Sequence, residues 1–207
     1  IQLLSVRHPL IENAVANDLH FGPDLTEIVI TGPNTGGKTI MLKTLGLAQI
    51  MAQSGLPILA DKGSRVGIFS QIFADIGDEQ SIEQSLSTFT AQIHNFSEAW
   101  PDIDSGTLVI LDEFGVGTDP SQGAALAQAV VDGLMEKGAW IGAATHFPAL
   151  KAYGLSRPGV RAASVIFSPD TKKPLFRLGY DQVGASRALD VAREQGLPES
   201  VLSRAEE

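Results

Sequence analysis

Cysteine is absent from this 207-residue sequence. Its absence excludes disulfide bonds and thiolate metal sites, and it is typical of a reducing compartment, so we expect a cytoplasmic location. The sequence also has no apolar run approaching the roughly 20 residues that a membrane-spanning helix needs, and no charged-then-apolar segment opens the chain. We therefore expect no membrane partner.

Basic residues are scarce, with 15 Lys and Arg against 24 Asp and Glu and a formal net charge of −9. A domain that grips duplex DNA by itself usually carries a basic face that neutralises phosphates. We therefore expect any nucleic-acid partner to be held by other parts of a longer protein. Ile1 in place of methionine and the helical character of the last residues suggest such a fragment. The length fits one large domain over residues 1–207.

A glycine-rich stretch at residues 32–39 reads GPNTGGKT and fits the phosphate-binding loop pattern G-x-x-x-x-G-K-[ST] at every fixed position. An apolar run at 27–31 precedes it and a helical pattern at 40–54 follows it, which is the context of strand, loop and helix. Glycines let backbone N–H groups approach phosphate oxygens, and the helix start adds further free N–H groups. The predicted ATP-binding residues are Gly32, Pro33, Asn34, Thr35, Gly36, Gly37, Lys38 and Thr39.

Two side chains of this loop are predicted to have separate tasks. Lys38 supplies a positive charge for the β and γ phosphates, and the Thr39 hydroxyl can complete the shell of a magnesium ion. ATP and Mg²⁺ are therefore the expected ligands. The alternative interpretation is a glycine-rich turn before an ordinary helix.

Two carboxylates, Asp112 and Glu113, follow a continuous apolar run at 107–111. Such a run is typical of a parallel strand covered on both faces, and ligands of open α/β sheets bind at the carboxyl ends of the strands. We predict that Asp112 holds magnesium directly or through water and that Glu113 polarises a water against the γ phosphate. The alternative is a strand that simply enters a turn.

Two further polar positions, His146 and Ser87, are candidates for contact with a γ phosphate. His146 directly follows the next predicted strand, 140–145, which places it on the same sheet edge as Glu113, where it can donate a hydrogen bond to the γ phosphate or the attacking water. Ser87 begins the helix that precedes the carboxylate strand. It is either an N-cap or a contact to a γ phosphate held by another subunit, and the spacing does not decide between them.

The order of strands and helices predicts an α/β protein with a mainly parallel sheet. Residues 1–26 are expected to form an N-terminal antiparallel sheet segment, 27–180 the P-loop core and 181–207 a C-terminal helical element. Within the core, short strands are predicted at 58–60, 66–69, 72–76, 163–167 and 175–178, and late helices at 185–195 and from residue 198.

Several of these strings, in this order, resemble the ATPase domains of MutS proteins, which belong to the ABC class. The resemblance covers nearly the whole chain from Arg7-His8-Pro9. Within the family, the residues of the motifs are similar to those of the MutS-two branch. The strings that carry it are NTGGKT at 34–39, DIGDEQSI at 75–82, SLSTF at 85–89, LDE at 111–113, GTDP at 117–120 and ATH at 144–146.

The resemblance implies a P-loop NTPase of the ABC class, a three-layer sandwich that forms a homodimer around two ATP molecules. It implies that Ser87 reaches the nucleotide of the partner subunit, that Asp119 lies in the loop coupling the two sites and that Gln80 reports on magnesium. The residues after 181 are similar to the family's helical dimerisation element. Catalysis would then fall to Glu113, His146 and Lys38, and metal binding to Thr39, Asp112 and Gln80.

The resemblance further implies a bacterial Mg²⁺-dependent ATPase that acts on branched DNA to limit recombination, or on stalled, collided ribosomes and their RNA. The family's lever, clamp and C-terminal nuclease regions are not part of this sequence. Three other interpretations stay open: a mismatch-repair MutS domain, a nucleotide-operated dimerisation switch with little hydrolysis, and, less favoured, a P-loop kinase.

Overall fold

The computed structural model describes residues 1–22, 24–77, 85–181, 189, 192–193 and 195–206. Its strands are β1 (Gln2–Val6), β2 (Asn17–His20), β3 (Glu27–Thr31), β4 (Gln71–Asp75), β5 (Thr107–Asp112), β6 (Trp140–Thr145), β7 (Val160–Phe167) and β8 (Pro174–Tyr180). Six of them form a sheet in the order β4-β5-β6-β3-β7-β8, in which only β8 runs antiparallel to its neighbour. Strands β1 and β2 pair separately as an antiparallel sheet. The predicted α/β class and the N-terminal antiparallel sheet are confirmed.

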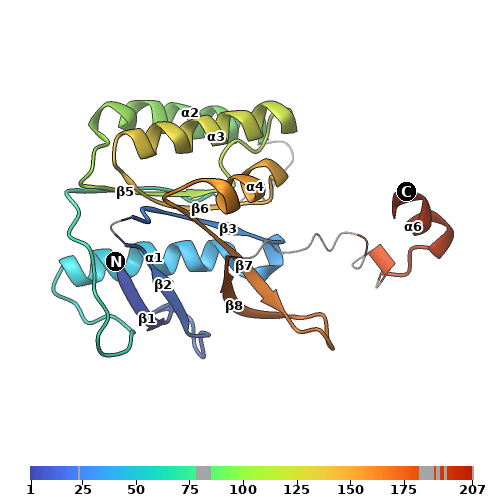
Figure 1. The fold of residues 1–207 in the computed structure, drawn as a ribbon, viewed down its shortest axis with the longest axis horizontal. Coiled ribbons are helices and arrows are strands. Elements are labelled where there is room, and N and C mark those ends of the chain that lie inside the picture. Colours follow the sequence, from blue (N-terminus) through green and yellow to red (C-terminus); the bar gives the residue numbers. More distant parts are fainter. Residues whose placement is uncertain (23, 78–84, 182–188, 190–191, 194, 207) are drawn as a thin grey trace.

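Helices cover both faces of the large sheet. The described helices are α1 (Lys38–Gln53), α2 (Ser85–Ala99), α3 (Pro120–Glu136), α4 (Pro148–Ser156) and α6 (Glu199–Glu206), with short 3₁₀ turns η1 (Asn34–Gly36) and η3 (Trp100–Asp102). Helices α2, α3 and α4 lie over one face, and α1 with the small sheet lies over the other (Figure 1). Two hydrophobic clusters fill the spaces between these layers.

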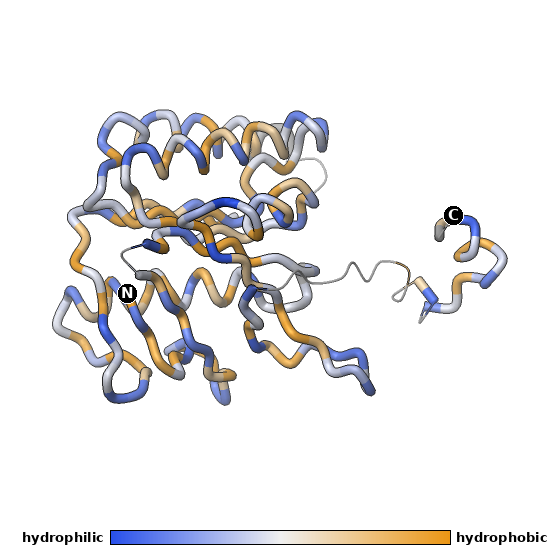
Figure 2. Tube along the Cα trace, in the orientation of Figure 1, coloured by the Kyte–Doolittle hydropathy of each residue, from blue (hydrophilic) through white to orange (hydrophobic). Residues whose placement is uncertain are grey.

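The central strands are apolar because both of their faces are covered. Every residue of β3 and of β5 is buried, as expected for parallel strands between two helical layers. Figure 2 shows hydrophobic residues concentrated along these strands and polar ones on the outer turns of the helices. The ends of β3, β5 and β6 therefore occupy fixed positions at one edge of a rigid sheet.

Two predicted strands, 58–60 and 66–69, are wrong, because the segment between α1 and β4 is an irregular loop. The backbone of this loop bonds to β1 only at isolated positions, such as Arg65 with Gln2, and side chains of α1 bind it at residues 67 and 69. Gln53 accepts a hydrogen bond from Phe69 N–H at 2.8 Å and donates one to Phe69 O at 3.0 Å. Apolar residues in a short run therefore indicated a strand where the backbone finds its partners elsewhere.

The chain after β6 differs from the prediction in other ways. Helix α4 was not predicted, and it begins with Pro148 at its first position, where a missing N–H costs nothing. Strand β7 starts at Val160, earlier than expected. The helix predicted at 185–195 falls mostly outside the described residues. No helix in the described part of the chain is long and apolar enough to cross a membrane.

Candidate functional site

The predicted functional side chains meet at one edge of the large sheet. Strand β5 ends at Asp112, β6 ends at Thr145, and β3 runs into Gly32. Asp112 lies beside Ala144 in the parallel register, and the N–H of Glu113 donates to Ala144 O at 2.9 Å. Glu113 and His146 therefore lie side by side, as their positions after adjacent strands predict.

The glycine-rich loop brings a lysine to the same edge. After β3 the chain passes through η1, and α1 begins at Lys38. At Gly36 an added Cβ would lie 3.0 Å from Val165, and Gly37 has a φ of 85° with Phe176 close to where its Cβ would be. A side chain at either position would crowd Val165 or Phe176, and at Gly37 it would also be strained by the positive φ. The glycines thus let the loop lie flat against β7 and β8.

Lys38 is almost completely buried, with 1% of its surface exposed. Its Nζ donates to the Gly32 carbonyl at 2.6 Å and to Glu113 Oε1 at 2.8 Å. A buried ammonium needs such partners, because an unpaired charge away from water is costly. The loop lysine and the second acid of the carboxylate pair, 75 residues apart in the chain, are therefore one ion pair.

The other acid binds the next loop residue. Thr39 Oγ1 donates to Asp112 Oδ2 at 2.5 Å. Asp112 Oδ1 is buried and has no hydrogen-bond partner within the described residues. Burial raises the pKa of Asp112, and the Glu113 charge adds to this, while the hydrogen bond from Thr39 and the lysine charges oppose it. The site thus holds a buried carboxylate oxygen that is ready to accept a ligand.

Glu113 is held from a second direction by His146. Its Oε2 lies 2.6 Å from His146 Nδ1 and 3.3 Å from the His146 backbone N–H. Burial raises the pKa of Glu113, but the hydrogen bond from His146 and the charge and hydrogen bond of Lys38 together bring it below its usual value. Glu113 therefore stays ionised, and its two oxygens have different partners.

The backbone at Glu113 explains how its side chain reaches both partners. Glu113 has a φ of 52°, in the left-handed region that non-glycine residues rarely adopt. The residue therefore does not continue the alternation of β5, and its side chain turns back over the sheet edge. Strain of this kind persists where the surroundings hold it and is concentrated at functional sites.

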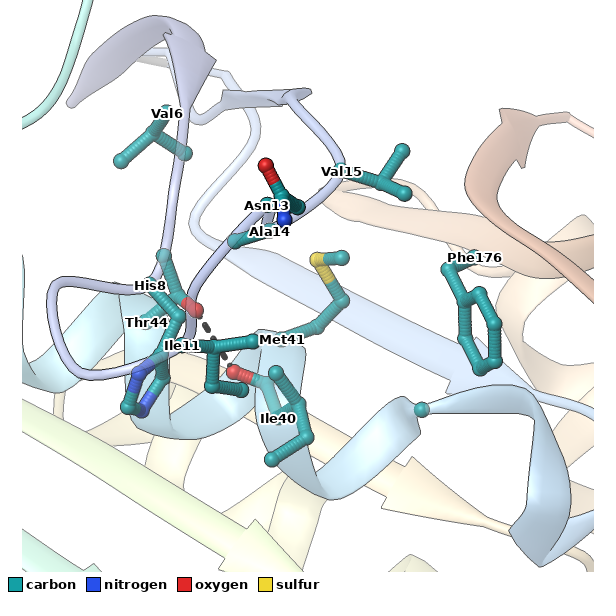
Figure 3. A pocket seen from close by; sticks show the side chains of 11 residues that line it. Val6, His8, Ile11, Asn13, Ala14, Val15, Ile40, Met41, Thr44 and Phe176 are labelled. Atoms are coloured by element: carbon teal, nitrogen blue, oxygen red, sulfur yellow. Dashed lines mark hydrogen bonds between the residues drawn. The ribbon is translucent and has the colours of Figure 1, made fainter.

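An open apolar pocket of about 260 Å³ adjoins the loop on the side of the small sheet. In Figure 3, Phe176 lies on one side of it and His8 and Ile11 lie on the other, with Met41 between them. Ile40 and Gly37 also line it, so its floor is the start of α1. Sequence reasoning missed this pocket, because Phe176 comes from β8, far away in the chain from His8 and Met41.

Of the three other predicted positions, the structure describes the side chain of Asp119 alone. Asp119 is the N-cap of α3, where its carboxylate accepts hydrogen bonds from the N–H groups of Ser121 at 3.1 Å and Gln122 at 2.9 Å. Ser87 lies in the first turn of α2, as predicted, but its side chain lies outside what the structure describes. Gln80 lies outside the described residues altogether.

The fold and this cluster define an α/β protein with a glycine-rich strand–loop–helix motif and a pair of acids at the carboxyl edge of a mostly parallel sheet. Within that class, the chain belongs to the MutS domain V family, whose model matches residues 28–207.

Curated relatives agree with this family and with the predicted branch. The chain is 65% identical over 210 residues to the protein named Endonuclease MutS2 of Solidesulfovibrio magneticus, which covers 99% of this chain. It is also 65% identical over 207 residues to Endonuclease MutS2 of Streptococcus gordonii and 58% identical over 209 residues to that of Maridesulfovibrio salexigens. The chain spans 27% of the length of each of these three relatives.

Proposed function

We propose that this chain is a P-loop ATPase domain of the ABC class that hydrolyses ATP to ADP and phosphate with Mg²⁺. The observation that carries the proposal is the cluster of Lys38, Thr39, Asp112, Glu113 and His146, which joins the glycine-rich loop to both acids. Membership of the MutS domain V family supports it.

Phosphate binding falls to the loop and the start of α1. The first N–H groups of α1 have no partners within the helix, and the helix dipole favours an anion there. Lys38 would leave Glu113 for the β and γ phosphates, since a phosphate offers its ammonium more negative charge. In the same step Glu113 loses its cation partner and becomes available to a water molecule.

The residues present fit a magnesium ion. Asp112 Oδ1 is buried without a partner in the described residues, and Thr39 Oγ1 lies next to the other oxygen of the same carboxylate. Mg²⁺ commonly takes one or two protein oxygens and fills its shell with water and substrate phosphates. Asp112 and Thr39 would hold the ion, with Gln80 proposed as a further contact. When bound, Mg²⁺ neutralises charge that develops on the phosphates.

The nucleobase is proposed to lie in the apolar pocket beside Gly37. Its lining has apolar and aromatic side chains that suit a flat heterocycle, including Met41 and Phe176. His8 lies against it, and burial, with the charge of Lys43 adding, lowers the pKa of His8 so that a neutral ring faces the base. The pocket and the phosphate loop share Gly37, so one nucleotide can occupy both.

Water activation is proposed for Glu113 with His146. The Glu113 carboxylate is ionised and can accept a proton or polarise water, and His146 Nδ1 lies 2.6 Å from it. His146 is half exposed, with 50% of its side-chain surface accessible, so it can turn toward a γ phosphate. Lys38, Glu113 and His146 are thus the proposed catalytic residues.

A homodimer is proposed to complete the site. Ser87 lies in the first turn of α2 and Asp119 caps the start of α3, and in this proposal each contacts nucleotide held by the partner subunit. Action on branched DNA or on collided ribosomes is proposed for the longer protein, since this chain carries a net charge of −9 and spans 27% of its relatives. Their name, Endonuclease MutS2, favours this branch over mismatch repair.

The proposal is tested by steady-state ATP hydrolysis measured against protein concentration, for the unaltered chain, Glu113→Gln and Ser87→Ala. We expect specific activity that rises with concentration. Glu113→Gln should lower kcat by at least about 100-fold while ATP binding persists, because general-base catalysis contributes roughly 10² to 10⁴. Ser87→Ala should lower activity only at concentrations where dimers form.

The matched control is Glu136→Gln, which changes the exposed glutamate at the end of α3 and should leave kcat unaltered. Absence of ATP hydrolysis at every concentration, with magnesium supplied, would refute the ATPase proposal. Activity that is independent of concentration and untouched by Ser87→Ala would retain the ATPase and refute the shared site. Light scattering with ATP present reports the dimer directly.

A further inference from the structure

Helix α2 contacts the turn after Glu113 through two side chains that lie one helical turn apart. Gln92 Oε1 accepts a hydrogen bond of 3.1 Å from the backbone N–H of Gly115. Phe96, four residues later and so on the same helix face, packs against Phe114 with 5.2 Å between ring centroids. Helix α2 thereby holds the two residues that immediately follow Glu113.

The turn has little freedom on its opposite side. Gly115 has a φ of 85°, and a Cβ added to it would lie 2.6 Å from the backbone oxygen of Gly123 in α3. Backbone therefore packs directly on backbone, and the turn cannot move toward α3. Because α3 blocks one side, the contacts of Gln92 and Phe96 hold the turn on the other.

Gln92 has a second partner at the end of a neighbouring strand. Its side chain lies beside the carboxylate of Asp75, the last residue of β4, and opposes the burial that raises the pKa of Asp75. Since Gln92 Oε1 accepts from Gly115, the NH₂ group is the part of the side chain that can donate to Asp75, because an ionised carboxylate only accepts. A primary amide fits this place because it presents one acceptor and one donor. Neither a leucine nor a glutamate can do both.

We propose that Gln92 is a positioning residue that sets the orientation of the Glu113 carboxylate from helix α2. This inference rests on the proposed function, since it requires Glu113 to act on water. Ser87 lies in the first turn of the same helix. When Ser87 contacts the nucleotide held by the partner subunit, that contact would displace α2. That displacement would reach Glu113 through Gln92 and Gly115. Gln92 therefore links occupancy of one site to hydrolysis.

The experiment compares four variants of the whole chain: Gln92→Leu, Gln92→Glu, the double variant Gln92→Glu/Asp75→Asn, and the exposed α2 control Asn95→Ala. Each is measured for kcat, for affinity toward a fluorescent ADP analogue, and for hydrogen exchange of the Gly115 amide. The double variant exchanges donor and acceptor, because the new amide at position 75 can donate to the new carboxylate at position 92.

For Gln92→Leu we expect kcat to fall at least about tenfold, because small displacements of a catalytic group are costly in rate. Its ADP affinity should stay within about twofold and its Gly115 amide should exchange faster, since the hydrogen bond is gone. Gln92→Glu should also lose kcat, because its carboxylate faces Asp75, and the double variant should recover most of it. Asn95→Ala should behave like the unaltered chain.

Retention of kcat in Gln92→Leu would overturn the inference, and so would a loss of ADP affinity as large as the loss of kcat. Failure of the double variant to recover kcat above Gln92→Glu would also overturn it. The exchange measurement separates this inference from the proposed function. If the unaltered chain hydrolyses no ATP, the proposed function fails, and the inference fails with it. Unchanged Gly115 exchange in an active enzyme would refute the Gln92 contact alone.

Discussion

Glu27, the first residue of β3, gives the chain a predictable dependence of stability on pH. No part of its surface is exposed, and neither of its carboxylate oxygens has a hydrogen-bond partner within the described residues. Burial raises the pKa of Glu27 to about 8, and the charge of Asp132 adds to this, while Arg157 opposes it. In the folded protein Glu27 is therefore a neutral acid below that pH.

The magnitude follows from proton linkage. The folded-state pKa of about 8 lies above the ordinary value of 4.5. The stabilising contribution is therefore complete below pH 4.5 and is lost as the pH rises through about 8. Between these limits the free energy of unfolding should fall by about 5 kcal/mol, and between pH 6 and pH 9 by about 2 to 3 kcal/mol.

The perturbation is Glu27→Gln, which keeps the shape of the side chain and removes its titration. Urea unfolding, followed by tryptophan fluorescence at pH 6, 7, 8 and 9, gives the free energy of unfolding of both proteins. Other titrating groups cancel in the difference between the two. We expect this difference to shift by about 2 to 3 kcal/mol in favour of the variant as the pH rises from 6 to 9.

Glu136→Gln is the matched control, because Glu136 is an exposed carboxylate on α3. This variant should follow the unaltered chain at every pH. A difference between Glu27→Gln and the unaltered chain that stays constant from pH 6 to pH 9 would refute the buried neutral acid. A shift of the opposite sign would refute it equally.

Two further predictions concern the proposed site. Asp119→Ala should lower the free energy of unfolding by about 1 kcal/mol, since it removes the N-cap of α3, whereas Asp119→Asn should keep the cap. If Asp119→Asn keeps full ATPase activity over the concentrations at which dimers form, the proposed contact to the partner's nucleotide is wrong. Phe176→Ala should raise the KM for ATP several-fold with little change in kcat, because its ring lies against Gly37 in the pocket. Leu175→Ala, an exposed neighbour on β8, is its control in steady-state kinetics, and an equal effect of both variants would contradict the pocket assignment.

The local elements around the site could be predicted from the sequence. Residues 27–39 and 107–113 combine an apolar run with polar residues at fixed spacing, and the parallel order of strands puts their ends on one edge. That argument placed His146 beside Glu113, and the structure has them in contact. Patterns within a few residues of each other determine such features.

The features of the site that the sequence did not predict depend on packing between segments far apart in the chain. The left-handed turn at Glu113, which directs its carboxylate to Lys38, depends on α2 and α3 holding the backbone. Phe176 meets the phosphate loop only because β8 folds beside β7. No local pattern encodes a contact between such distant segments. The irregular loop at 54–70 was misjudged for the same reason, since its backbone partners include side chains of α1 and isolated positions of β1.

The ion pair between Lys38 and Glu113 means that Glu113 competes with the nucleotide for the ammonium of Lys38. The Glu113 carboxylate lies 2.8 Å from the Lys38 ammonium, which is proposed to bind the phosphates. Nucleotide binding would then exchange one anion for another, and the observed affinity would be what remains after the internal pair is broken. The same exchange would run in reverse after hydrolysis. Each time the internal pair re-forms, it would help expel the product, so the residue proposed to cleave ATP would also help to release what is left of it.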